Sequence, residues 1–250
     1  MHKPFKPFKI DKTKYNNIYF ASDFHRQHDR NFIYEPRGFK SCQEHTSFID
    51  KCCTSLTSKD LLIFLGDVAL NSSYIDTFNF IKSIKAQKFW IWGNHYSWEL
   101  PIYEKALNII TNTLQSDLFD GALDYDIYPL TTNLYNFDTT IGLKLQQDDE
   151  NLITFFGQSA SFHIGHTIYF CRHMAPLIWD RQKYDNFVCL CGHSHGNLEC
   201  AKPSVLKEGK ILDIGVDNAI LTNGTPFFTI EEIDKILSKK KIKIYDHHRE

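Results

Sequence analysis

The feature that most constrains this 250-residue chain is an alternation, in its first half, of short apolar runs with longer segments of helical period. The runs Ile18–Ala21, Leu61–Leu65 and Phe89–Trp92 are rich in β-branched and aromatic residues and predict strands. Strands separated by helices are typical of right-handed crossovers, so we expect a buried, largely parallel sheet. The predicted helices are Glu44–Leu56, Tyr74–Ile84 and Trp98–Ile110.

The second half of the chain changes character after Gly121 and predicts mostly strands. Turns are expected at Gly157, Gly165 and Asn223–Gly224, and the polar segment Thr139–Asn151 predicts a solvated hairpin or loop. The predicted strands are Asp126–Tyr128, Leu134–Phe137, Leu152–Phe156, Ser161–Ile164, Thr167–Cys171, Phe187–Leu190 and Ile211–Ile214, and a closing helix is predicted at Glu231–Leu237.

The two halves are expected to form one α/β domain, because no linker rich in Gly, Ser or Pro divides them and no internal repeat occurs. An α/β half joined to a β half predicts a sandwich of two sheets with helices outside. We assign residues 18–237 to this domain, residues 1–17 to a basic N-terminal leader and residues 238–250 to a polar tail.

Composition excludes several classes of protein. Hydrophobic residues make up 42% and charged residues 23%, which are ordinary globular values. No apolar stretch predicts a membrane span or a signal peptide, and a net charge of −2 argues against a general polyanion-binding protein. Seven cysteines without a C-x-x-C motif suggest free thiols in a reducing compartment. We therefore expect a cytoplasmic protein, or one in the host cytoplasm if a phage encodes it.

Side chains that bind metal ions follow five of the predicted strands. Because the carboxyl ends of strands in open α/β sheets converge on one crevice, these side chains are expected to lie close together. Three of the five segments contain a glycine that permits a sharp turn. The segments are Asp23-Phe24-His25, Gly66-Asp67, Gly93-Asn94-His95, Arg172-His173 and Gly192-His193-Ser194-His195.

The spacing of these residues favours a metal site with imidazole and carboxylate ligands. Residues two apart on an extended segment face the same way, so Asp23 and His25 can bind one ion, and His193 and His195 can bind one ion or two. Such ligands suit Mn²⁺, Fe or Zn²⁺. Two divalent ions, Asp23, Asp67 and a bridging hydroxide would leave about one positive charge, which suits a phosphate oxygen. The implied reaction is in-line attack of the hydroxide on phosphorus.

The five segments, in this order, resemble the motif series of the calcineurin-like metallophosphoesterases over residues 18 to about 216. A closer resemblance is to a small single-domain bacterial and phage branch of that family. It implies a four-layer α-β-β-α sandwich of two mixed sheets flanked by helices, and a dinuclear metal-dependent hydrolase. The residues that carry this closer resemblance are Ser22-Asp23-Phe24-His25 with His28 and Asn31, Arg37-Gly38-Phe39, Pro176 with Trp179, Gly192-His193-Ser194-His195-Gly196 and Ile214-Gly215-Val216-Asp217.

The resemblance also implies a role for each residue. The catalytic residues would be His95, Asp67 and Asn94, with His95 outside the metal shell and donating a proton to the leaving oxygen or stabilising the transition state. Two divalent ions are implied, with Mn²⁺ favoured over Fe, Zn²⁺ or Ni²⁺. Asp23, His25 and His195 would hold the first ion, Asp67 would bridge, and Asn94, His173 and His193 would hold the second. His28, Asn31 and Arg172 are weaker candidates for phosphate contacts, because loop polar residues beside a site often only shape it.

The sequence departs from the family at Tyr96, where an acid usually follows Gly-Asn-His, so what orients His95 is left open. Leu70 argues against a purple acid phosphatase, and the absence of Asp-Arg-Gly after Gly66 argues against a Ser/Thr protein phosphatase. The expected substrate is a phosphodiester or a phosphomonoester, with a small nucleotide favoured over nucleic acid.

The alternative is a metal-binding scaffold protein with the same fold and no catalysis. Relatives of that kind typically lack parts of the motif series, whereas every part is present here. Tyr96 would be the first suspect for a defect. The sequence does not decide the oligomeric state.

Overall fold

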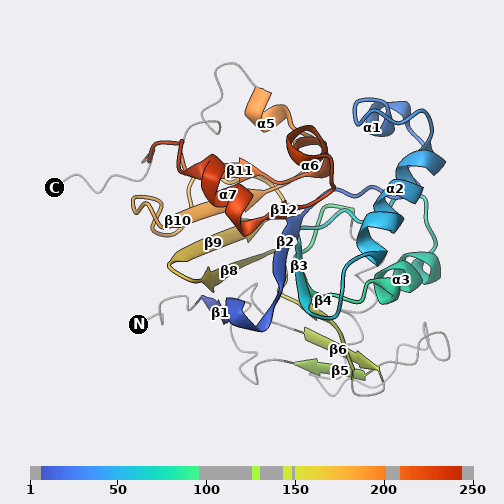
Figure 1. Cartoon of the computed structure of the whole chain (residues 1–250), viewed down its shortest axis with the longest axis horizontal. Coiled ribbons are helices and arrows are strands. Elements are labelled where there is room, and N and C mark those ends of the chain that lie inside the picture. The colour runs from blue at the N-terminus through green and yellow to red at the C-terminus, as the bar shows by residue number, and fades with distance from the viewer. Residues whose placement is uncertain (1–6, 96–125, 130–142, 148–149, 201–208, 244–250) are drawn as a thin grey trace.

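A computed structural model of the chain describes residues 7–95, 126–129, 143–147, 150–200 and 209–243. The described elements form an α/β fold built on two mixed sheets (Figure 1). In the larger sheet the four central strands run parallel, and antiparallel strands flank them on both sides. Its order is β12 (Phe228–Thr229), β2 (Asn17–Ala21), β3 (Asp60–Phe64), β4 (Gln87–Trp90), β7 (Glu150–Phe155), β6 (Leu143–Gln147) and β5 (Asp126–Pro129).

The smaller sheet packs face to face against the larger one. It contains one antiparallel pair, β8 with β9, and its other neighbours run parallel. Its order is β1 (Phe8–Ile10), β8 (Ser159–Ile164), β9 (Thr167–Arg172), β10 (Phe187–Cys191) and β11 (Ile211–Asp213).

Alternating side chains on the central strands separate two cores. Leu61 and Ile63 of β3 lie between the sheets, in a cluster that includes residues of β8, β9 and β10. Leu62 and Phe64 of the same strand face the opposite way, toward the helical layer. All four side chains are fully buried, because both faces of this strand are covered.

Two helices, α2 (Cys42–Thr54) and α3 (Tyr74–Ser83), cover the outer face of the larger sheet (Figure 1). A serine caps the N-terminus of each helix, Ser41 for α2 and Ser73 for α3, and its hydroxyl accepts a hydrogen bond from a backbone N–H of the first turn. Their apolar faces contribute to the cluster that contains Leu62 and Phe64.

The C-terminal helices α6 (Val216–Asn223) and α7 (Ile230–Leu237) close another side of the sandwich. Ile233 and Leu237 of α7 enter the core between the sheets, and Thr229 with Glu232 forms a capping box at the start of that helix. The shorter helices are η1 (Lys12–Lys14), α1 (Asn31–Tyr34) and α5 (Asn197–Cys200).

The sequence does not predict β1 or α6. Phe8 to Ile10 lie within the predicted basic leader, yet they pair in parallel with β8, and the Phe8 ring contacts Phe89, Phe156 and Phe162. Because this strand has only three residues and lies among lysines, its sequence shows no alternation long enough to predict it. Two predicted elements, Trp98–Ile110 and Leu134–Phe137, lie outside the described residues.

For the polar segment 139–151 the sequence left a hairpin or a loop open, and in the structure β6 pairs antiparallel with β7. No helix in the described ranges is long and apolar enough to cross a membrane. Cys189 and Cys191 face the same small core, as expected from their spacing. Both are free thiols, as are Cys42, Cys52, Cys53 and Cys171.

Replacing Ile63 with alanine should lower the free energy of unfolding by about 2–5 kcal/mol, because it leaves a cavity between the two sheets. Urea denaturation followed by circular dichroism measures this change. Ile75→Ala, at a side chain that is 51% exposed, is the matched control and should change stability by less than about 0.5 kcal/mol. Equal losses in the two variants would contradict this account of the core.

Candidate metal centre

The carboxyl ends of strands from both sheets meet at one edge of the sandwich. The segments after β2 and β3 stay hydrogen-bonded, with Asp23 N–H donating to Gly66 C=O and His25 N–H to Asp67 C=O, both at 3.0 Å. The Val216 N–H, after β11 of the smaller sheet, donates to Ser22 C=O at 3.1 Å. These bonds bring together polar residues that lie far apart in the sequence.

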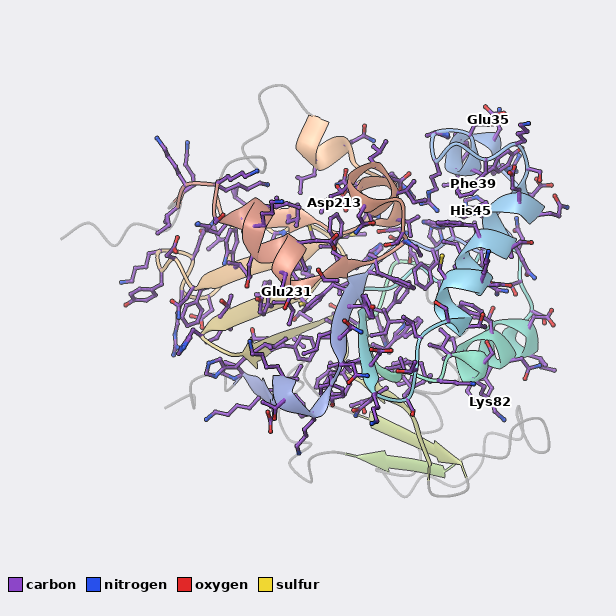
Figure 2. The ribbon with its side chains drawn as sticks, viewed as in Figure 1. Glu35, Phe39, His45, Lys82, Asp213 and Glu231 are labelled. Atoms are coloured by element: carbon purple, nitrogen blue, oxygen red, sulfur yellow. The ribbon has the colours of Figure 1, made fainter. Side chains whose placement is uncertain are left out.

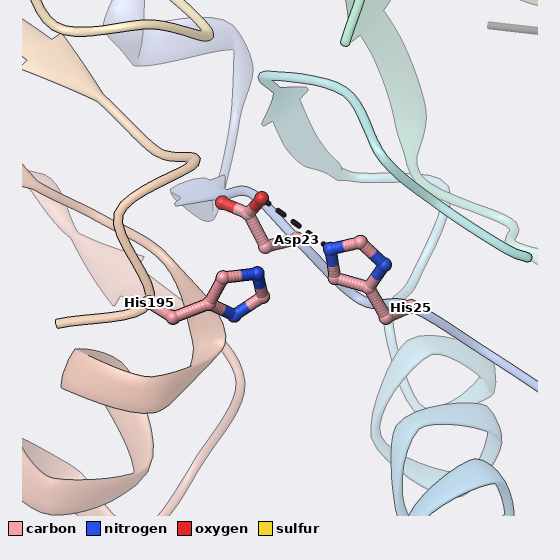
Figure 3. Close-up of side chains that lie close together, drawn as sticks. All are labelled: Asp23, His25 and His195. Carbon is pink, nitrogen blue, oxygen red and sulfur yellow. Dashed lines mark ion pairs between the residues drawn. The ribbon is translucent and has the colours of Figure 1, made fainter. Parts of the chain in front are cut away.

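The first group that could hold a metal ion is Asp23, His25 and His195 (Figure 3). One ligand atom of each side chain lies within 4.8 Å of the others. His25 Nε2 is 3.7 Å from Asp23 Oδ1, and the rings of His25 and His195 are 4.9 Å apart. Asp23 and His25 are buried, whereas the His195 side chain is 30% exposed.

The second group is Asp67, His173 and His193, and one ligand atom of each of these side chains also lies within 4.8 Å of the others. His173 Nε2 lies 3.3 Å from Asp67 Oδ2 and 2.8 Å from Asn94 Oδ1, so three potential ligand atoms converge. The resemblance assigned these same residues to two metal ions, with Asp67 as the bridge and Asn94 in the second set.

Asp67, a member of the second group, also lies close to the first. Its Oδ2 is 3.3 Å from His173 Nε2 in the second group and 3.8 Å from His25 Nε2 in the first. This position suits a carboxylate that bridges two cations, the role that the sequence resemblance implies for it.

A backbone N–H from another strand end fixes each carboxylate. Asp23 Oδ2 accepts a hydrogen bond from His193 N–H at 2.8 Å, and Asp67 Oδ1 accepts one from His95 N–H at 2.9 Å. In each case the other oxygen is turned toward the imidazoles.

Several buried polar atoms of the first group have no hydrogen-bond partner. They are Asp23 Oδ1 and both ring nitrogens of His25. Burying such atoms without partners costs about 1–3 kcal/mol each. A divalent cation would satisfy Asp23 Oδ1 and one nitrogen of His25, so the donor set fits a metal ion that prefers nitrogen and oxygen ligands.

Electrostatics also favour a cation. Burial raises the pKa of Asp23, but the neighbouring histidines outweigh it and hold that pKa well below its usual range. Burial lowers the pKa of His173, but its hydrogen bond to Asp67 and the charges of Asp67 and Asp23 raise it to about 9. Leu65 C=O lies 2.7 Å from His173 Nδ1 and can only accept, so Nδ1 carries a hydrogen and Nε2 faces the second group.

Left-handed backbone is concentrated at these residues. Among the described residues, eight that are not glycine have positive φ, and five of them belong to the two groups. Such conformations cost free energy and persist where surrounding structure enforces them, often at functional sites. The five are Asp23, His25, Asp67, His193 and His195, with φ between 46° and 66°.

His95 lies at the mouth of the centre. Its side chain is 39% exposed, its Nε2 is 4.0 Å from Asp67 Oδ2, and its ring is 5.7 Å from that of His25. Asn94, the preceding residue, points to His173 instead. Tyr96 lies outside the described residues, so the departure from the family at that position is not tested.

The three weaker candidates lie in different surroundings. His28 is buried, its ring is 5.3 Å from that of His25, and burial together with neighbouring histidines lowers its pKa to about 4. Arg172 lines a pocket of about 350 Å³ with Asn94 and His173. Asn31 is exposed at the start of α1, and its side chain forms no hydrogen bond with another described residue.

The sequence assigned no role to Arg37, Asp213 or Asp217, although two of the motifs quoted above contain Arg37 and Asp217. Arg37 is 5% exposed and bound to Asp217, which also contacts His195. Asp213 accepts hydrogen bonds from Ser194 Oγ and Gly196 N–H, and so holds the His193–His195 loop. Burial and the Asp23 charge raise the pKa of Asp213 to about 6.

Comparison with known proteins leaves the family open. No family model matches the chain, and no curated protein matches it in sequence. A crystal structure of a protein of unknown function from Aquifex aeolicus is similar in fold, with a TM-score of 0.49 and 17% identity, over 88% of this chain and 98% of that one. This likeness carries no argument about function.

Gly93→Ala should weaken metal binding at the Asp67 group, because a Cβ at this position would overlap the Asp67 carboxylate. We expect loss of one bound ion in Mn²⁺ titrations by calorimetry, with folding checked by circular dichroism. Gly165→Ala is the control, since no atom lies within 4 Å of its Cβ and only the strain of φ +61° remains. Unchanged binding in Gly93→Ala would contradict the placement of Asp67.

The metal-free protein should lose stability as the pH rises from about 6.5 to 9. The pKa of His173 is raised from 6.5 to about 9, so its contribution is full below 6.5 and is lost as the proton leaves near 9. Urea denaturation in a chelator at several pH values measures this loss. His173→Asn should flatten the dependence, and an equally steep decline in that variant would contradict the assignment.

Proposed function

We propose that the protein is a dinuclear metal-dependent phosphoesterase of the calcineurin-like type, with the four-layer sandwich of that family. The observation that carries this proposal is the pair of adjacent groups, Asp23–His25–His195 and Asp67–His173–His193, with Asp67 Oδ2 between them. Two cations joined by a bridging carboxylate suit in-line displacement at phosphorus, because one can stabilise the attacking oxygen and the other the leaving oxygen.

The first group would hold one divalent ion and the second group, with Asn94, would hold the other. Mn²⁺ is the favoured ion, and Fe, Zn²⁺ or Ni²⁺ would suit the same ligands. When bound, the ions supply Lewis acidity that lowers the pKa of water and neutralises charge on the phosphoryl group. The side chains of the protein would position the two ions. Asp67 lies close to both groups, and Asn94 points toward His173.

His95 would act on the leaving group. Water, having lost one proton to solvent, would add to phosphorus as hydroxide while the bond from phosphorus to the leaving oxygen breaks. His95 would donate a proton to that oxygen and regain one from solvent. The half-exposed side chain of His95, 4.0 Å from Asp67 Oδ2, supports this role, because it is near both the centre and solvent.

The pocket beside the second group supports a substrate larger than phosphate alone. Arg172 lines it together with Gln158, Met174 and half-buried Trp92. A guanidinium suits a phosphate oxygen and the apolar atoms suit a nucleoside, so a small nucleotide-type diester is the favoured substrate, with a monoester or nucleic acid as alternatives.

The test is hydrolysis of bis-p-nitrophenyl phosphate and p-nitrophenyl phosphate by chelator-stripped protein, before and after addition of Mn²⁺. We expect turnover that requires Mn²⁺, and a fall in kcat of about 10²–10⁴-fold in His95→Ala with two ions still bound. His163→Ala, at a half-buried histidine on β8, is the matched control and should keep its activity.

Metal binding without turnover of either substrate would instead favour the scaffold protein. Failure of the wild-type protein to bind metal would reject the proposal. Full activity in His95→Ala would remove His95 from the mechanism.

A further inference from the structure

The Arg37 guanidinium is buried and all three of its nitrogens are in use. Nε donates to Asp217 Oδ1 at 3.1 Å and Nη2 donates to Asp217 Oδ2 at 2.8 Å, which forms a bidentate ion pair. Nη2 also donates to Asp23 C=O at 3.0 Å, and Nη1 donates to Phe24 C=O at 3.2 Å and to His45 Nε2 at 2.9 Å. Arg37 therefore fixes the left-handed backbone at Asp23, a ligand of the first group.

His45 is suited to accept this bond. It is fully buried on α2, with the Phe39 ring 5.3 Å away (Figure 2). Burial and the Arg37 charge lower the pKa of His45 to about 3, so the ring is neutral and Nε2 can offer its lone pair. His45 thus completes the set of acceptors around Arg37.

Asp217 also contacts His195, the third member of the first group. Its Oδ2 lies 3.1 Å from His195 Nδ1. Arg37 Nη2 lies 3.2 Å from the same nitrogen, but its two hydrogens go to Asp217 Oδ2 and Asp23 C=O. Since a carboxylate oxygen only accepts, we assign the ring hydrogen of His195 to Nδ1, which leaves the lone pair of Nε2 for a cation. A carboxylate behind a ligating histidine fixes the ring and its tautomer.

The charges of the pair suit a neighbouring cation. Arg37 and Asp217 together are neutral, so the buried guanidinium adds little repulsion toward an ion held by Asp23 and His195. Removing the carboxylate alone would leave an uncompensated positive charge there. Removing the guanidinium alone would leave a negative charge that attracts the ion.

We infer that Arg37 and Asp217 form a positioning pair for the first cation, in which Asp217 orients His195 and Arg37 fixes the backbone of Asp23. This inference rests on the metal centre of the proposed function. It assigns roles to two residues that no ligand motif contains. A purely structural ion pair would contribute to stability without favouring either ion.

The test is Mn²⁺ titration of the full chain, followed by calorimetry and by the electron paramagnetic resonance signal of coupled Mn²⁺ pairs. Asp217→Asn should bind the first ion about 10–100-fold more weakly and the second ion unchanged. At intermediate Mn²⁺ both this variant and His195→Ala should show an uncoupled signal. Arg37→Gln should lose less affinity than Asp217→Asn, because it removes the repelling charge.

A double-mutant cycle distinguishes an effect of Asp217 that acts through His195 from a general loosening of the metal site. In a His195→Ala background, Asp217→Asn should cost clearly less affinity for the first ion than it does in the wild type, since its partner is already absent. Equal costs in both backgrounds would overturn the inference. If Asp217→Asn does not fold, Asp217→Glu in the same cycle decides the question, because it keeps the charge but displaces the carboxylate from His195.

The matched control is Asp50→Asn, which breaks a second bidentate pair. Arg26 Nε and Nη2 lie 2.5 and 2.7 Å from the Asp50 carboxylate, outside both metal groups. This variant should keep both affinities. A wild-type protein that binds no metal would reject the proposed function, whereas two ions bound equally well by wild type and Asp217→Asn would overturn only this inference.

Discussion

Two buried carboxylates, each held by the backbone of a distant strand end, determine how the rest of the centre is arranged. Asp23 accepts from the N–H of His193, and Asp67 accepts from the N–H of His95. The first bond joins the larger sheet to the smaller one, so the orientation of a side chain and the assembly of the sandwich depend on the same contact.

Close approach of the loops is what makes these contacts possible. A Cβ on Gly192 would overlap Ser22 and the Asp23 carboxylate, just as one on Gly93 would overlap Asp67. The glycines that follow the strands therefore allow a backbone N–H to reach each carboxylate. The polar atoms that remain, among them Asp23 Oδ1 and the nitrogens of His25, are buried without partners and line a space that could hold a cation.

The sequence could predict the strands, and the edge at which the polar residues meet, because both follow from local patterns. The division of those residues into two groups came from the family resemblance. Leu61 to Leu65 alternates between two cores, and Asp23 with His25 follows a strand directly, so topology alone brings such residues to one edge. The Arg37–Asp217 pair was not predictable in this way. Its members are 180 residues apart, neither follows a strand at ligand spacing, and their contact joins the turn after α1 to the first turn of α6. β1 was not predicted because its three residues, which lie among lysines, are too few to show the alternation of a strand.

The hydrogen bond from His193 to Asp23 spans 170 residues, which has a consequence for synthesis of the chain. While the ribosome extends the polypeptide, β2 and β3 can pair early, but the second carboxylate oxygen of Asp23 has no backbone donor until the segment after β10 has emerged. Contacts of such long range form late and slowly. A nascent chain would thus lack the complete group of Asp23, His25 and His195 through most of its translation, and this group would form among the last events of folding.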